Sequence, residues 1–151
     1  MDTNITTPAS AAYNHLLDLT DFFGPVIDTY TREQAIEDGT LVQAPAKMVR
    51  EAGIALPVAF TRAAWEEMVT WTEADSERQV PQDETGRLWD VLWIARHAMA
   101  RSASTDRVDF KVYRVRRGGR AVTARPVWLA LVLGGGDEGE PVLTIMLPSE
   151  S

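Results

Sequence analysis

The hydrophobic pattern of this chain changes its period once, and this change limits the folds that the chain can adopt. From Leu88 to Met99 the apolar residues recur every 3.6 positions, the spacing of one helix face. From Val108 to Tyr113 apolar and polar residues alternate, which is typical of a half-buried strand. Helices in the first part of a chain and strands in the last part indicate an α+β domain.

The last third of the chain predicts three strands joined by short loops. The strands are expected at 108–113, 127–133 and 142–147, with a tight hairpin turn at Gly118 and Gly119. The glycine-rich segment 134–140 is expected to be a hairpin loop, because it precedes a strand and its three acidic side chains would repel phosphate. We therefore expect N-terminal helices packed on a C-terminal three-stranded antiparallel β-meander.

Shorter elements are expected before the long helix. Thr31 and Gln34 form a capping box for a helix that Gly39 ends, and Thr61 is an N-cap for a helix to about Thr72. A short strand at 41–42 and a helix at 46–52 lie between these two helices. The polar segment 73–83 contains Pro81 and predicts a loop or an irregular acidic turn.

Length and composition indicate one globular domain. The 151 residues are 45% hydrophobic and 25% charged, which excludes a disordered chain. Residues 1–22 are expected to form a variable, partly frayed N-terminal helix, and residues 23–151 the single α+β domain. No apolar run is long enough to cross a bilayer, and no basic residue opens the N-terminus as in a secretory signal, so a cytoplasmic protein is expected.

Residues suited to catalysis or metal binding are sparse. The chain has no cysteine and only two histidines, which lie far apart at positions 15 and 97. It also lacks a Gly-x-Ser-x-Gly elbow, and its acidic clusters are most simply solvated helix faces. We expect no catalytic set, no metal site and no cofactor. The alternative is an enzyme or small-ligand site between the long helix and the sheet, using Arg87, Asp90, Arg114 and the acids around Glu73.

A basic segment stands out in this acidic chain. The net charge is −7, yet residues 106–125 carry seven basic and two acidic side chains. Arg114, Arg116, Arg117 and Arg120 surround the expected hairpin turn. Arginine-bearing β-ribbons bind nucleic acid in some proteins, so nucleic-acid binding by this hairpin is one hypothesis. The alternatives are that the arginines protect an edge strand from pairing or bind acidic helices of the same chain.

Tryptophan is the second unusual feature. Trp65 and Trp128 fit the core, whereas Trp89 and Trp93 are spaced to stack beside His97 on the flank of the long helix. Aromatic residues and arginine anchor many protein interfaces, although a second helix would also bury such rings. The residues that we expect to bind a protein partner are Trp89, Trp93, His97, Arg114, Arg116, Arg117 and Arg120.

Four stretches of the chain resemble an uncharacterised family known only as a domain of unknown function. They are Tyr30–Gly39, Pro57–Trp65, Gly86–Trp93 and Gly139–Pro148, and the resemblance covers about four-fifths of the chain. Members of that family are small proteins from bacterial chromosomes, plasmids and phages. The resemblance implies no activity or site, but it implies a mobile-element context, in which a non-enzymatic binding protein would act on a host macromolecule.

Overall fold

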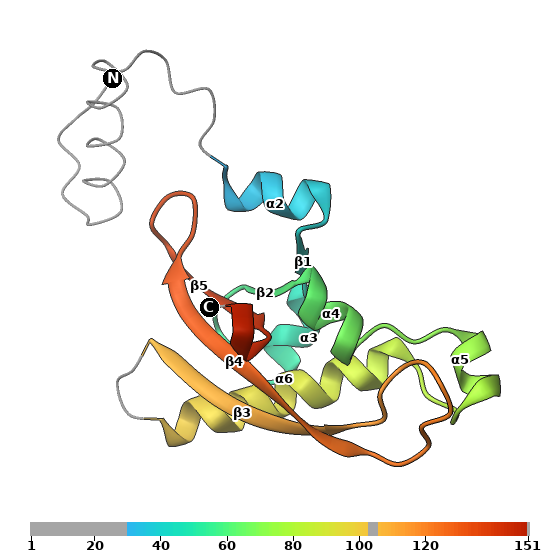
Figure 1. Ribbon diagram of the computed structural model, residues 1–151. Helices are drawn as coiled ribbons and strands as arrows, with labels where there is room; N and C mark the ends of the chain where they lie inside the picture. The colour runs from blue at the N-terminus through green and yellow to red at the C-terminus, as the bar shows by residue number, and fades with distance from the viewer. Residues whose placement is uncertain (1–29, 103–105, 151) are drawn as a thin grey trace, which may run out of the picture.

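The computed structural model of the chain describes residues 30–102 and 106–150. The N-terminal helix expected within residues 1–22 lies outside these residues. In chain order the elements are α2 (Arg32–Asp38), β1 (Leu41–Gln43), α3 (Ala46–Glu51), β2 (Val58–Thr61), α4 (Arg62–Met68), α5 (Glu73–Arg78), α6 (Glu84–Arg101), β3 (Arg107–Arg114), β4 (Arg125–Gly135), β5 (Pro141–Met146) and the 3-10 helix η1 (Pro148–Glu150), as Figure 1 shows.

The strands form one five-stranded mixed sheet in the order β1-β2-β5-β4-β3. β2 and β5 are parallel neighbours, and the other neighbouring strands are antiparallel. The α+β class is confirmed, but the expectation of a three-stranded antiparallel meander is wrong, because two earlier strands extend the sheet beyond β5. The missed strand β2 is buried on both faces at Val58, Ala59 and Phe60, so its sequence shows no alternation.

The core lies between one face of the sheet and helices α3, α4 and α6. On α6 the buried side chains Leu88, Val91, Leu92 and Ala95 belong to one cluster with apolar residues of β2, β3, β4 and β5. The opposite face receives α2, because Arg32 donates a hydrogen bond of 2.9 Å to the Thr144 hydroxyl, which alternates with core residues along β5. The predicted packing of the long helix on the C-terminal strands is confirmed.

Local signals placed most helix starts, with one error. The capping box of Thr31 and Gln34 begins α2, and Thr61 caps α4. The prediction of a loop across residues 73–83 is wrong for residues 73–78, because Thr72 and Asp75 form a second capping box that begins α5. Within the described residues, no helix is both long and apolar enough to span a membrane.

Candidate functional site

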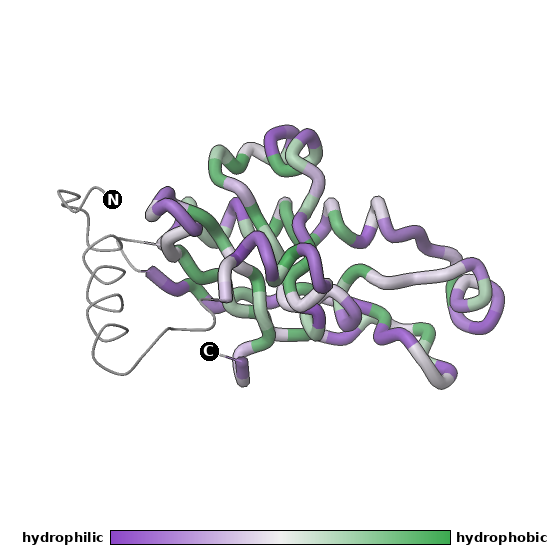
Figure 2. The backbone as a smooth tube through the Cα atoms, turned by 90° about the horizontal axis from the view of Figure 1, so that it is seen from above, coloured by the Kyte–Doolittle hydropathy of each residue, from purple (hydrophilic) through white to green (hydrophobic). Residues whose placement is uncertain are grey.

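Three surface features carry the residues with binding potential. The ridge is Trp89, Trp93 and His97 on α6, the hairpin is the segment 115–124 between β3 and β4, and the platform is Lys111, Tyr113 and Trp128 on β3 and β4. Figures 1 and 2 both place the hairpin and α5 at the same end of the molecule. The ridge and hairpin were expected from the sequence, whereas the platform was not.

The ridge is a continuous stack of three rings on one flank of α6. The Trp89 and Trp93 rings are stacked with centroids 5.8 Å apart, and the His97 ring lies 4.5 Å from that of Trp93. A contact of 2.8 Å between His97 Nδ1 and the Trp93 carbonyl fixes the imidazole. Trp93 is 47% exposed and His97 is exposed, while Trp89 is partly buried against the core. The spacing of four residues that predicted this stack is confirmed.

A shallow depression adjoins the ridge at the start of α6. Its lining residues are Gln82, Asp83, Gly86, Arg87, Trp89 and Asp90. Asp83 is the N-cap of α6 and accepts a 2.6 Å hydrogen bond from the Gly86 N–H. The Asp90 side chain is 62% exposed, with its nearest cation, Arg114, 4.0 Å away. Two carboxylates therefore lie beside the aromatic rings, and most of the Asp90 carboxylate faces solvent.

The structure separates the four predicted hairpin arginines. Arg114 is buried, and its Nη2 donates to the Arg87 carbonyl over 3.0 Å. Arg116 pairs with Glu67 at 2.9 Å, and Arg117 donates to Asp75 at 2.6 Å. Arg120 is exposed. Of the alternatives weighed from sequence, pairing with acidic helices of the same chain therefore holds for three of these residues, because Arg114 also pairs with Asp90 of α6 at 4.0 Å.

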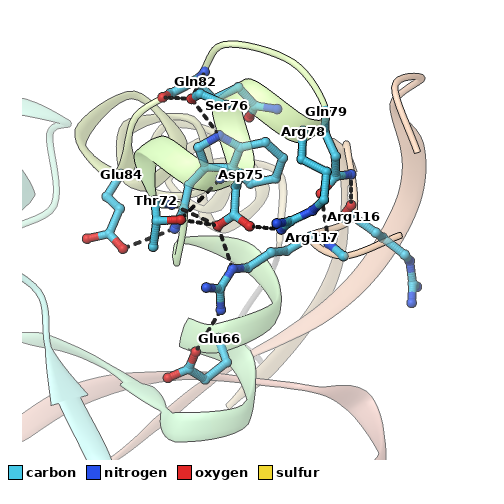
Figure 3. A network of polar contacts seen from close by, with 12 residues as sticks. Glu66, Thr72, Asp75, Ser76, Arg78, Gln79, Gln82, Glu84, Arg116 and Arg117 are labelled. Carbon is cyan, nitrogen blue, oxygen red and sulfur yellow. Dashed lines mark hydrogen bonds and ion pairs between the residues drawn. The ribbon is translucent and has the colours of Figure 1, made fainter. Parts of the chain in front are cut away.

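Asp75 is the centre of the network that joins α5 to the hairpin (Figure 3). Its buried carboxylate accepts hydrogen bonds from the Thr72 backbone N–H and hydroxyl and from the guanidinium groups of Arg78 and Arg117. Gln79 completes this network, because its Nε2 donates to the Arg116 carbonyl at 2.8 Å and its Oε1 accepts from a glycine N–H of the turn. The sequence reasoning missed this network, although the spacing of Thr72 and Asp75 was a readable capping signal.

Hydrogen bonding holds the pKa of the Asp75 carboxyl well below its ordinary value. The Thr72 backbone N–H has the largest effect, and Arg117 acts in the same direction, while burial opposes both. A carboxyl with a lowered folded-state pKa stabilises the fold fully above its unfolded pKa, about 3.9, and the contribution is lost as the pH falls toward the folded-state value.

We therefore expect Asp75→Asn to reduce the dependence of the free energy of unfolding on pH in the acidic range. Between about pH 4 and pH 2 the free energy of unfolding of the wild type should fall more steeply than that of the variant. Urea unfolding at a series of pH values measures both slopes. Glu77→Gln removes an exposed carboxylate from the same helix and should keep the wild-type slope. Equal slopes in the wild type and Asp75→Asn would contradict the assignment.

Three of the groups suggested for a site between helix and sheet meet in space. Arg87, Asp90 and Arg114 lie together at the first turns of α6, and burial lowers the pKa of Arg114 and, with the charge of Arg114, lowers that of Arg87 to about 10. Arg87 stays charged at neutral pH, and its hydrogen bonds go to backbone carbonyls and Gln82. The hydrogen bonds of the two arginines thus connect parts of the fold. No group of acidic or histidine side chains in residues 30–102 and 106–150 is arranged to hold a metal ion.

The platform lies on the sheet face that is turned away from α6. Trp128 is 53% exposed, so its assignment to the core is wrong. Its neighbours Val127 and Leu129 are buried, and the alternation that they set places Trp128 on the opposite face. The sequence hid this alternation, because the outward residue Ala130 is buried as well.

The protein-family model described as "Family of unknown function (DUF6573)" matches residues 19–151 of the chain. The match includes every helix and strand of the described residues, and it confirms the resemblance to a family of unknown function. Neither the curated proteins nor the solved structures contain a match to this chain.

Proposed function

Because the chain belongs to DUF6573, a family of unknown function, we propose its role from its surface: a non-enzymatic binding protein that docks a partner protein on the ridge of α6. The observation that supports this role is the exposure of Trp93 between two ring contacts. Of the residues predicted to bind, Arg114, Arg116 and Arg117 already have partners within the chain. The ridge is therefore the better anchor.

The stacking of the ridge favours binding. Ordering a side chain at an interface costs free energy, and rings that are already held by their neighbours lose little freedom when a partner arrives. Trp93 touches a ring on each side, and His97 is held through its Nδ1 contact. A rigid aromatic anchor of this kind is typical of residues that dominate the affinity of protein interfaces.

The depression beside the ridge indicates the chemistry of the partner. Asp83 and Asp90 line it next to Trp89. A lysine or arginine of the partner would meet carboxylate charge there and an aromatic face alongside. We therefore propose a partner that presents a basic side chain beside an apolar patch. Such surfaces occur on proteins that bind nucleic acid. An acidic protein of net charge −7 can mimic the nucleic acid that those proteins bind.

We place this interaction in the cytoplasm of a bacterial host, with the protein encoded by a phage or plasmid. This context rests on the family resemblance and not on the geometry. It predicts that the partner is a host macromolecule.

Trp93→Ala is expected to weaken partner binding by at least about 30-fold, since truncating a central aromatic anchor typically costs about 2 kcal/mol or more. The tagged protein would capture partners from nuclease-treated host lysate for identification by mass spectrometry. The affinity of the purified partner would then be titrated against each variant.

Trp128→Ala is the matched control, because it removes an equally exposed tryptophan from the opposite face of the sheet. It should leave the affinity for the partner unchanged. Equal affinities for the wild type and Trp93→Ala would end the proposal, as would an equal loss in both variants.

A further inference from the structure

The platform combines two exposed rings and a cation on adjacent strands. Lys111 is the ladder partner of Trp128, and Tyr113 lies two residues further along the same face of β3. Phe110 and Val112, on either side of Lys111 in β3, are buried in the core, so all three platform side chains point away from α6. Tyr113 is 61% exposed. Nothing in the described part of the chain covers these two rings completely.

Lys111 lies between the two rings. Its Nζ is 5.6 Å from the centroid of the Tyr113 ring and 5.9 Å from that of Trp128. Two aromatic ring faces beside a positive charge are complementary to a single strand of nucleic acid, because its bases stack and its backbone is anionic. Side chains on one face of a β-sheet project from a rigid backbone, so these rings lose little freedom when a ligand binds.

The charges around the platform divide into two sets. Arg114, Arg116 and Arg117 are engaged inside the fold, as described above. Among the residues that the structure describes, Lys111 and Arg120 have no salt bridge, and Arg120 lies in the hairpin beyond Tyr113. Arg125 has none either, but it is the ladder partner of the buried Arg114 and therefore lies on the α6 side of the sheet. The one carboxylate on the outward side of β3, Asp109, is paired with Arg107 at 3.0 Å. Most other carboxylates lie on the helices, including α2 on the same sheet face, and Asp137, Glu138 and Glu140 lie in the loop between β4 and β5.

From this arrangement we propose that the platform binds single-stranded nucleic acid. Bases would stack on Trp128 and Tyr113, and Lys111 and Arg120 would neutralise phosphates along the ribbon. A duplex is a poor ligand, because its base faces are already stacked and cannot reach the rings. The site is separate from the ridge, and it uses the sheet face and only Arg120 of the four arginines on which the hairpin hypothesis depended.

Fluorescence anisotropy of a short labelled oligothymidylate and of the corresponding oligouridylate tests the proposal on the full chain. We expect binding of one or both at low salt, and binding of a duplex of the same length to be much weaker. Two phosphate contacts predict that the logarithm of the association constant falls with a slope of about −1.4 against the logarithm of salt concentration. The comparison of the two oligonucleotides distinguishes DNA from RNA as the ligand.

Ring variants separate stacking from general charge attraction. Trp128→Ala should weaken binding by roughly 5- to 150-fold, the range for loss of one stacked base, and Trp128→Phe should recover most of it because it restores a ring. Trp128→Leu, similar in apolar character but without a flat π-face, should behave like the alanine variant. Trp93→Ala, on the other face, should bind the oligonucleotide as the wild type does.

Several results would overturn this proposal. They are absence of binding at low salt, equal affinity for single strand and duplex, binding that ignores salt, or equal affinity in the wild type and Trp128→Ala. If oligonucleotides do not bind, but Trp128→Ala abolishes the capture of a protein partner that persists after nuclease treatment, the platform is a protein interface instead. Failure here leaves the role of the ridge untouched, because that role is measured by protein capture and Trp93→Ala.

Discussion

Replacing Arg87 with alanine is expected to lower the free energy of unfolding by about 3–5 kcal/mol, since several buried acceptors lose their donor together. Arg87 is only 2% exposed. Its guanidinium donates to the carbonyls of Glu67, Val69 and Val115 and to the Gln82 side chain over 3.1–3.3 Å. For a domain whose total stability is about 5–15 kcal/mol, the loss would leave a large fraction of the chain unfolded at modest temperature.

The position of Arg87 explains why the effect should be large. The carbonyls that it binds belong to the end of α4 and to the start of the hairpin, so one side chain connects α4, α6 and the hairpin. Its guanidinium carbon also lies 4.6 Å from the centroid of the buried Trp71 ring. Substitution with leucine or methionine would fill the volume but leave the same carbonyls without a donor, so we expect these variants to be destabilised too.

Urea unfolding followed by circular dichroism measures this effect. Arg101→Ala is the matched control, because it removes an exposed arginine from the last turn of the same helix. Its effect should stay within about 0.5 kcal/mol. An Arg87→Ala variant as stable as Arg101→Ala would show that these hydrogen bonds contribute nothing to the fold.

Leu92→Ala is the second variant with a large expected effect, about 2–5 kcal/mol of destabilisation. Leu92 is fully buried on the side of α6 that faces the sheet. Removal of its terminal carbons leaves a cavity that close-packed neighbours fill only partly. The same unfolding measurement gives its size.

Trp93→Ala provides the comparison on the adjacent residue. Trp93 is exposed on the flank, so we expect its truncation to cost less than about 1 kcal/mol despite the larger volume removed. This contrast is also the stability control for the binding experiment on the ridge. If Trp93→Ala unfolded the domain and Leu92→Ala did not, the assignment of the two faces of α6 would be reversed.

Local patterns in the sequence located most elements of the fold. The long helix, its buried side and the stack of Trp89, Trp93 and His97 followed from a helical period that needs no knowledge of distant residues. The three C-terminal strands followed from the alternation in β3, from the apolar runs of β4 and β5 and from the paired glycines of the hairpin. Capping residues marked the start of α2 and α4, because a cap is satisfied within three residues.

Pairing between distant segments was not readable in the same way. β2 joins β5 in parallel across more than eighty residues of chain, and a buried strand carries no mark of its neighbour. Asp75 meets Arg117 only because α5 folds against the hairpin, and each residue alone looks like an ordinary surface charge. The exposure of Trp128 depended on which face of β4 the helices cover.

The sequence by itself determined the helices, the strands that alternate and the ring stack on α6, because these depend on hydrogen bonds and side-chain spacing within a few residues. Only the tertiary structure decided the order of the sheet, which arginines became buried or paired, and which rings faced solvent. Those outcomes depend on packing between segments far apart in the chain, where charge and apolar surface on one element are satisfied by another.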